Sequence, residues 1–336
     1  MRGSRSSCGR RCFSAALVLA FAACTQLPGS DVRATNDPRL LPRNESPPAA
    51  LVGGPSAAAP APAAEPLPVR AKSIGHTSYV LKLTLSDGML GVFKPRSRRP
   101  LGDRRYRGEI AAYRLARALG LDNVPRAEPR AFPLASLRAA CATYPGGAEQ
   151  LDREVLVDAD GTVRGAFIEW IDDYRELPVE SSSWRARWEP WVLDSHAKVG
   201  KKERTLATAI STMIVFDYVI ANWDRYSGGN VARDGDSGSV LFVDNDGAFY
   251  EPPPAQPLAR QFGMVQRVVR FSRQFVTALR GLDKTKLEHI FGEESAGKPL
   301  LPQSAVIATD DRRRRAIKAI DAHLAARGEQ TTLAFE

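Results

Sequence analysis

The chain has 336 residues, of which 43% are hydrophobic and 25% are charged. This composition is typical of a globular protein and excludes a collagen-like, mucin-like or wholly disordered chain. The length allows one large domain with appendages or two small domains. The net charge is +9, but four arginines near the amino terminus account for much of it, and no long basic stripe with interleaved aromatic residues follows them. We therefore predict no nucleic-acid partner.

Residues 1–24 have the three parts of an export signal. An arginine-rich start precedes the apolar run Phe13–Ala23, and small residues lead to Cys24. The run is too short to span a bilayer of about 30 Å. The sequence Phe21-Ala22-Ala23-Cys24 resembles the lipobox of bacterial lipoproteins, in which the cysteine is acylated. The alternatives are a plain secretory signal and a cytoplasmic chain whose first residues are not a signal.

The lipobox implies a protein of the cell envelope that is held at the membrane by its amino-terminal lipid. Thr25 and Gln26 follow the cysteine, so the aspartate that often retains lipoproteins in the inner membrane is missing, and the outer membrane or the periplasmic face is favoured. Residues 25–70 contain ten prolines and almost no periodic apolar pattern. We predict that they form a disordered tether and that residues 71–336 form the folded domain.

The first part of this domain is predicted to be rich in strands. Alternating apolar residues indicate strands at Tyr79–Leu85 and Met89–Phe93, and Asp87-Gly88 between them is typical of a hairpin turn. Helical spacing follows at Arg107–Leu119. A second hairpin is predicted from Val155–Asp158 and Val163–Ile171.

The second part is predicted to be rich in helices. Arg204–Ala221 is a mostly apolar helix, and the polar loop Asn222–Asn230 and the short strand Val240–Val243 follow it. Further helices are predicted around Leu258–Arg280 and Arg312–Ala326. The fold class is therefore α+β with two lobes, an N-lobe of about residues 71–171 and a C-lobe of about 172–336, and it is not an alternating βαβ fold.

Charged residues stand where strands and helices would keep them partly buried. Lys94 ends an apolar strand, Glu109 opens the next helix, Asp224 and Asn230 share the polar loop, and Asp244 ends a later strand. Phosphoryl transfer requires these residue types, because a lysine can hold phosphate oxygens, oxygen ligands can hold magnesium, and an aspartate can accept the proton of the attacking hydroxyl. Each residue alone is also compatible with a structural role.

Four segments carry a resemblance to known kinases. Gly91–Pro95 resembles the lysine strand of type II phosphatidylinositol 4-kinases, and Glu109–Leu115 is similar to the corresponding helix of the secretory-pathway kinases related to Golgi casein kinase and Four-jointed. Asp217–Arg225 and Val243–Phe249 resemble the catalytic loop and metal-binding segment of both groups, and HipA-type kinases share this arrangement. The resemblance implies a two-lobed, protein-kinase-like fold.

The resemblance also implies a role for each residue at the site. Lys94 contacts the nucleotide phosphates, Glu109 pairs with Lys94, and Asp224 is the catalytic base. Asp244 binds Mg²⁺ or Mn²⁺, and Asn230 is the second ligand of the metal ion. The nucleotide-binding residues are Gly75 and His76 of the phosphate-covering loop, Lys94, and Glu169 and Ile171 of the adenine connector.

The implied activity is transfer of a phosphoryl group from ATP to a hydroxyl of a protein, glycan or lipid. The alternative is an inactive pseudokinase that binds a nucleotide or another ligand.

Asn230 lies six residues after Asp224, where the common kinase spacing is five, and Gly228-Gly229 can absorb the extra residue. Two features are set apart from the site: a tryptophan and arginine cluster at 184–191, either packing or acceptor-binding, and Arg312–Arg315, predicted to be a solvated face.

Overall fold

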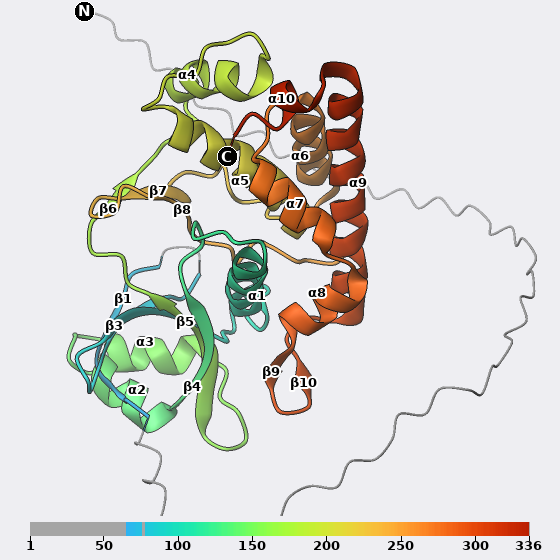
Figure 1. The fold of residues 1–336 in the computed structure, drawn as a ribbon. Coiled ribbons are helices and arrows are strands. Elements are labelled where there is room, and N and C mark those ends of the chain that lie inside the picture. The colour runs from blue at the N-terminus through green and yellow to red at the C-terminus, as the bar shows by residue number, and fades with distance from the viewer. Residues whose placement is uncertain (1–64, 76–77, 336) are drawn as a thin grey trace, which may run out of the picture. The chain divides into compact units, whose positions relative to one another are not determined.

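Five antiparallel strands form the sheet of the N-lobe, in the spatial order β1-β2-β3-β5-β4 (Figure 1). The computed structural model describes residues 65–75 and 78–335, which lie within the compact unit Ala63–Glu336. Helices α2 and α3 pack beside the sheet, and α1 lies between the sheet and the helical lobe. The elements of this lobe are β1 (Pro68–Ser73), β2 (Leu81–Leu85), β3 (Leu90–Pro95), α1 (Arg105–Ala118), β4 (Ala127–Pro133), α2 (Leu134–Cys141), α3 (Gly147–Glu154) and β5 (Thr162–Glu169).

The predicted hairpin is present as β2 and β3. Leu81 pairs with Phe93 across it, and the alternating side chains of β2 are buried in the N-lobe core. Two predictions need correction. The folded part begins earlier than residue 71, because β1 starts at Pro68. Val155–Asp158 is not a strand, since Val155 makes only an isolated bridge to Ser97, and β5 pairs with β3 and β4 instead.

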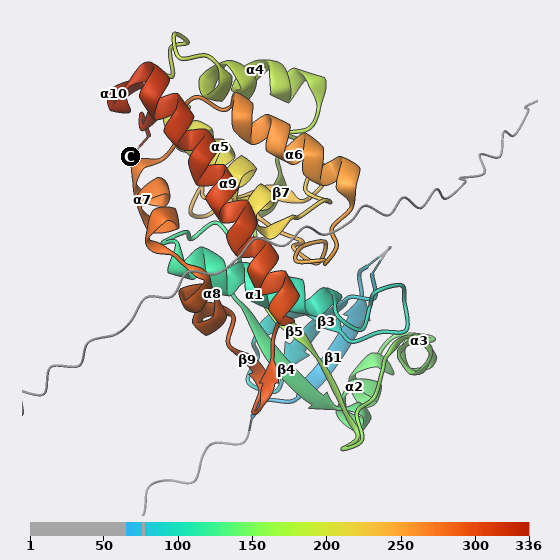
Figure 2. The same cartoon turned by 90° about the vertical axis from the view of Figure 1, so that its right-hand side faces the viewer.

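Helix α5 is the centre of the C-lobe. It is buried on nearly all sides, as its apolar sequence predicts, and it packs against α4, α6 and α9, the last of which runs along the whole lobe (Figure 2). Strands β7 and β8 follow its carboxyl end and pair with β6, which precedes α4, in a small sheet of order β6-β7-β8. The elements are β6 (Tyr174–Glu176), α4 (Ser182–Leu193), α5 (Arg204–Ile220), β7 (Val231–Asp234), β8 (Val240–Phe242), α6 (Ala255–Arg267), α7 (Arg273–Gly281), α8 (Lys284–Phe291), β9 (Glu293–Ser295), β10 (Lys298–Pro299), α9 (Gln303–Arg327) and α10 (Glu329–Thr332).

The region after residue 250 differs from the predictions in two ways. The single helix expected at Leu258–Arg280 is two helices, because the chain becomes extended at Val268 and Ser272 caps α7 by accepting a hydrogen bond from the Phe275 amide. The prediction that Arg312–Arg315 is a solvated face is correct only for Arg314 and Arg315, which are exposed. Arg312 and Arg313 are buried: Arg312 donates to the Val219 carbonyl, and Arg313 pairs with a carboxylate one turn earlier in α9.

Helix α1 connects the two lobes. Its buried side chains, among them Tyr106, Ile110 and Leu115, belong to the hydrophobic core of the C-lobe together with Phe291 of α8. The same helix also packs along β4 and β5 of the sheet. The α+β arrangement in two lobes confirms the predicted fold class. Among the helices of the described residues, none combines the length and the apolar content needed to cross a membrane.

Candidate active site

A cleft of about 860 Å³ lies between the two lobes, and it contains the predicted site. Its walls are the inner face of β3 and β5, the beginning of α1, the loop after α5 and the segment after β8. His76 lies outside the described residues. All the other residues predicted for the site line this cleft: Gly75, Lys94, Glu109, Glu169, Ile171, Asp224, Asn230 and Asp244. Residues far apart in the sequence are therefore brought together at one place.

The ammonium group of Lys94 is surrounded by carboxylates. Its Nζ lies 2.6 Å from Glu109 Oε1, 2.6 Å from Asp244 Oδ1 and 3.4 Å from Asp246 Oδ2. Burial disfavours the charge of Lys94, but Asp244, Glu109 and Asp246 together raise the pKa of Lys94 well above its ordinary value. Lys94 is thus a permanent cation at the floor of the cleft, held by side chains from both lobes.

Glu109 connects Lys94 to the opposite wall of the cleft. Its Oε1 accepts one hydrogen bond from Lys94 Nζ and another from the backbone amide of Asn245, at 3.1 Å. Burial raises the pKa of Glu109, and the charge of Lys94 opposes that rise. The predicted lysine and glutamate pair is present, and its carboxylate also contacts the backbone of the predicted metal-binding segment.

Asp244 is the exposed member of this carboxylate group. Its side chain is 43% accessible, whereas those of Glu109 and Asp246 are almost fully buried. Burial of the Asp244 carboxylate tends to raise its pKa, but the charge of Lys94 outweighs this effect and lowers the pKa below its ordinary value. The backbone at Asp244 is left-handed, with φ of 55°, which turns the chain sharply after β8. This turn directs both Asp244 and Asp246 toward Lys94.

Three contributors to the site were not among the predicted residues. Asp246 accepts hydrogen bonds from Ser78 Oγ at 2.9 Å and from Arg105 at 3.2 Å, and Arg105 also donates to Ser78. Ser78 is the last residue of the predicted phosphate-covering loop, 74–78, but it was assigned no role, and Arg105 begins α1. The sequence indicated Asp246 in part, because it lies in the kinase-like segment Val243–Phe249. Its partners could not be inferred, since they are more than 140 residues away in the sequence.

The loop after α5 is organised by a buried arginine. Arg225 pairs with Asp217, with Nε 3.0 Å from Oδ2, and donates to the backbone carbonyls of Asn230 and Val243 and to the side chain of Asn245. Both charged side chains are almost completely inaccessible to solvent. The arginine therefore fixes the loop that carries Asp224 relative to the segment that carries Asp244.

Asp224 projects into the cleft from this loop. Its backbone amide donates to Asn222 Oδ1 at 3.2 Å, and Asn222 is itself held through its carbonyl by Gln261 of α6. Burial raises the pKa of Asp224, and the neighbouring carboxylates of Asp244 and Asp246 raise it further. An aspartate with a raised pKa at the surface of a cleft is suited to accept a proton.

Asn230 lies at the far end of the same loop. Its amide nitrogen donates to the Asp224 carbonyl at 2.9 Å and to Ser227 Oγ at 3.2 Å. Gly228 and Gly229 both have positive φ, of 98° and 72°, so they accommodate the extra residue of the loop as glycines do most readily. Both side-chain bonds use the amide nitrogen, which leaves the amide oxygen as the atom able to ligate a cation.

The donor set fits a hard divalent cation. Mg²⁺ and Mn²⁺ prefer carboxylate and amide oxygens, and the cleft presents these on Asp244, Asp246 and Asn230. Among the described residues, no group of three or more His, Cys, Asp or Glu side chains has the arrangement of a preformed metal site. Here the carboxylates converge on Lys94 instead.

The predicted adenine connector follows the end of β5. Phe167 packs into the N-lobe core, whereas Ile168, Glu169 and Ile171 line the cleft. Trp170 between them lies under the ammonium group of Lys82, which is 3.5 Å from the centre of its ring. The connector therefore presents backbone and side chains to the cleft beside a fixed aromatic residue.

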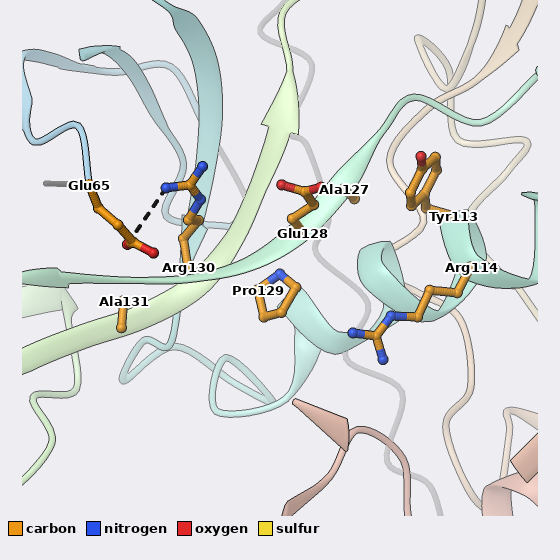
Figure 3. Close-up of a pocket in the computed structure, with 8 residues that line it drawn as sticks. All are labelled: Glu65, Tyr113, Arg114, Ala127, Glu128, Pro129, Arg130 and Ala131. Carbon is orange, nitrogen blue, oxygen red and sulfur yellow. Dashed lines mark ion pairs between the residues drawn. The ribbon is translucent and has the colours of Figure 1, made fainter. Parts of the chain in front are cut away.

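A second hollow of about 610 Å³ lies on another surface of the N-lobe (Figure 3). It is formed by β4 and α1, with Tyr113 and Arg114 on one side and an ion pair of 3.7 Å between Glu65 and Arg130 on the other. It contains none of the residues predicted for the site. The tryptophan cluster lies in α4, where Trp188 is buried and donates to the Val179 carbonyl, as the packing interpretation predicts.

Comparison with solved structures identifies the fold. No family model matches the sequence, and no curated protein matches it. The crystal structure of Golgi casein kinase superposes with a TM-score of 0.56 at 15% identity, covering 79% of this chain and 75% of that chain. The same protein with Mn/ADP bound gives the same values. The structure of hydra Fam20 with sugar gives 0.55 at 18% identity, covering 80% of this chain and 88% of that chain.

The chain has an atypical kinase fold. This confirms the two-lobed, kinase-like fold that the resemblance implies. The resemblances to type II phosphatidylinositol 4-kinases and to a lipoprotein signal stay predictions. The roles assigned to the residues of the cleft also stay predictions, although their placement agrees with such roles.

Proposed function

We propose that the protein is an ATP-dependent phosphotransferase that moves the γ-phosphoryl group of ATP to a hydroxyl acceptor. The observation that carries the proposal is the convergence, in one cleft, of the Lys94–Glu109 pair with Asp244 and Asp224. Catalysis of phosphoryl transfer depends mainly on positioning and on neutralising charge, and these residues supply both. The bound ligands of the Golgi casein kinase structure, Mn and ADP, support a nucleotide and a divalent cation.

The side chains divide the work by position. Lys94 is charged and held by Glu109, so it can bind phosphate oxygens once Asp244 or Asp246 releases it. Asp244, together with the amide oxygen of Asn230, would hold Mg²⁺ or Mn²⁺, which supplies positive charge to the phosphates when it is bound. Asp224 faces the same cleft and accepts the proton of the acceptor hydroxyl. The acceptor oxygen then bonds to the γ-phosphorus, whose bond to the bridging oxygen breaks to leave ADP.

The test is a matched pair of aspartate variants of the purified protein. Calorimetry measures ATP binding with and without Mn²⁺, and release of ADP measures transfer to water, peptides, glycans or phosphoinositides. Asp244→Ala should lose both metal-dependent binding and transfer, because it removes the cation ligand. Asp224→Asn keeps the shape of the side chain, so binding should survive while transfer falls by about 10²–10⁴-fold.

The outcomes separate the possibilities. Wild-type protein that binds ATP and Mn²⁺ but transfers nothing, with Asp224→Asn identical to it, would identify a pseudokinase. Wild-type protein that binds neither ligand would refute the assignment altogether.

We also propose that the protein is exported and held in the cell envelope by a lipid on Cys24, on the outer-membrane or periplasmic side. Support comes only from the sequence of residues 1–24, which lie outside the described residues. Wild-type protein should partition with membranes, and Cys24→Ala should stay unprocessed or become soluble. Equal partitioning of the two forms would refute the proposed lipid anchor. The acceptor would then have to be sought outside the cell envelope.

A further inference from the structure

Glu294 is a buried carboxylate in the short hairpin β9–β10. The hairpin leaves the C-lobe after α8 and extends beside α1 toward the sheet (Figures 1 and 2). Its other residues are exposed, but the side chain of Glu294 is only 3% accessible. A carboxylate is costly to bury unless charged or hydrogen-bonding partners surround it, so the partners of Glu294 indicate what the hairpin holds.

Those partners come from the N-lobe side of the molecule. Glu294 accepts hydrogen bonds from the hydroxyl of Tyr106 and from Arg107, whose Nη2 lies 2.9 Å from Oε2, and Nη1 of Arg164 in β5 is 3.8 Å from Oε1. Burial and the carboxylate of Glu294 raise the pKa of Tyr106, so the hydroxyl stays protonated and donates a hydrogen bond to Glu294. One carboxylate thus ties the first turn of α1 and a strand of the sheet to the C-lobe.

The end of α8 and the start of β9 contact α1 at a second point. Arg114, two turns further along the helix, donates to the carbonyl of Phe291 and, at 3.1 Å, to the carbonyl of Glu293. The two points of attachment lie on either side of Glu109. They therefore define both the axial position and the rotation of the helix where Glu109 leaves it, one turn after Tyr106.

The position of α1 matters because Glu109 has two partners at fixed distances. Its Oε1 contacts Lys94 Nζ at 2.6 Å and the Asn245 amide at 3.1 Å. A small rotation or shift of α1 would lengthen both bonds together. Displacements of about 1 Å at a reacting centre cost about 10²-fold in rate, so the site depends on how firmly the helix is held.

We propose that Glu294 is a positioning residue of the phosphotransfer site, which holds α1 so that Glu109 stays against Lys94. The role rests on the proposed function. It assigns a purpose to the hairpin after residue 290, which neither the composition nor the kinase-like motifs explain.

Glu294→Gln tests this role, with Glu293→Gln as the matched control on the same hairpin. The glutamine keeps the size of the side chain but loses the charge that attracts the two arginines. With ATP and Mn²⁺ and with water as the acceptor, we expect kcat for ADP formation to fall between about 10- and 100-fold while KM for ATP changes by less than about 3-fold. Glu294→Asp keeps the charge and should recover part of the loss, whereas Glu293→Gln should match wild type.

A double-variant cycle with Glu109→Gln distinguishes positioning from a general structural role. If Glu294 acts through Glu109, adding Glu294→Gln to Glu109→Gln should cost little further activity. Multiplicative losses, or a folded Glu294→Gln protein with wild-type kcat, would overturn the proposal.

Hydrogen exchange supplies a readout that does not need activity. The backbone amides of α1 between Glu109 and Arg114 should exchange faster in Glu294→Gln than in wild type or Glu293→Gln. Unchanged exchange would overturn the proposal even if no variant, wild type included, releases ADP. Absence of activity in wild type together with faster exchange would instead count against the proposed function and leave the hold on α1 established.

Discussion

Lys94 and Arg225 are both buried cations held by carboxylates, but their surroundings differ in charge balance. Arg225 faces the single carboxylate of Asp217 and otherwise donates to neutral carbonyl and amide oxygens. Lys94 faces three carboxylates, and within residues 65–75 and 78–335 Arg105 is the one other cation paired with them. The Arg225 cluster is neutral, whereas the Lys94 cluster carries one negative charge in excess.

This difference separates a structural pair from a site prepared for a ligand. A neutral, fully hydrogen-bonded pair needs nothing further, and it fixes the backbone around it. An excess of buried negative charge raises the free energy of the empty protein, and a bound cation can relieve it. The first two of the following substitutions each change the charge balance of one cluster, and the third removes the charge of Asp224 beside the Lys94 cluster.

Replacement of Lys94 by methionine should have the largest effect. It removes the phosphate-binding cation, so transfer should fall by at least about 10²-fold. It also leaves three carboxylate oxygens converging on one vacated point, and Mn²⁺ should therefore raise the melting temperature of Lys94→Met more than that of wild type.

Thermal unfolding with and without Mn²⁺ measures this effect, with Lys72→Met on the exposed side of β1 as the control. Equal metal-induced shifts in wild type and Lys94→Met would show that the carboxylates do not act as a cation site.

Replacement of Arg225 by methionine should mainly reduce stability. It leaves Asp217 as an unpaired buried carboxylate and deprives the Val243 carbonyl of its arginine donor, while the Asn230 carbonyl keeps only the hydrogen bond from the Val243 amide. The free energy of unfolding should fall by about 3–5 kcal/mol, measured by urea denaturation. Arg233→Met, on neighbouring strand β7, is the control. A loss below about 1 kcal/mol would contradict the balanced, structural interpretation of this cluster.

Replacement of Asp224 by asparagine should give the smallest effect on stability, and in the opposite direction. Because burial raises the pKa of Asp224, its ionised form is disfavoured in the folded protein, and that cost appears as the pH rises above the ordinary value of 3.8. Asp224→Asn should therefore melt slightly higher than wild type at neutral pH, and the difference should vanish below 3.8. A lower melting temperature at neutral pH would indicate that the hydrogen bond from Ser227 to the carboxylate outweighs the cost of burying its charge.

The sequence was informative where the determining interactions are local. The hairpin of β2 and β3 and the ends of α5 follow from patterns spanning fewer than about 20 residues, and the cleft residues were found from such local segments together with their resemblance to kinases. The boundary between α6 and α7 was missed because the apolar pattern continues through the break, which depends on a backbone change at Val268 and a cap at Ser272.

The partners of the buried charges were not predictable from one sequence. Tyr106 and Glu294 are separated by 188 positions and Ser78 and Asp246 by 168. Nothing in either local segment indicates which distant side chain will meet it. The burial of Arg312 was missed for the same reason, since a run of arginines after two aspartates is equally typical of an exposed helix face.

Glu109 has a consequence for the timing of the reaction. A single oxygen of this carboxylate is shared between Lys94 on a strand of the N-lobe and the Asn245 amide in the C-lobe, and Lys94 itself bonds to Asp244 across the cleft. Separation of the lobes must break the Asn245–Glu109 and Lys94–Asp244 contacts together. Opening of the cleft is therefore opposed by the same bonds that organise it, and we expect release of ADP, visible as a burst of product in the first turnover, to limit the rate.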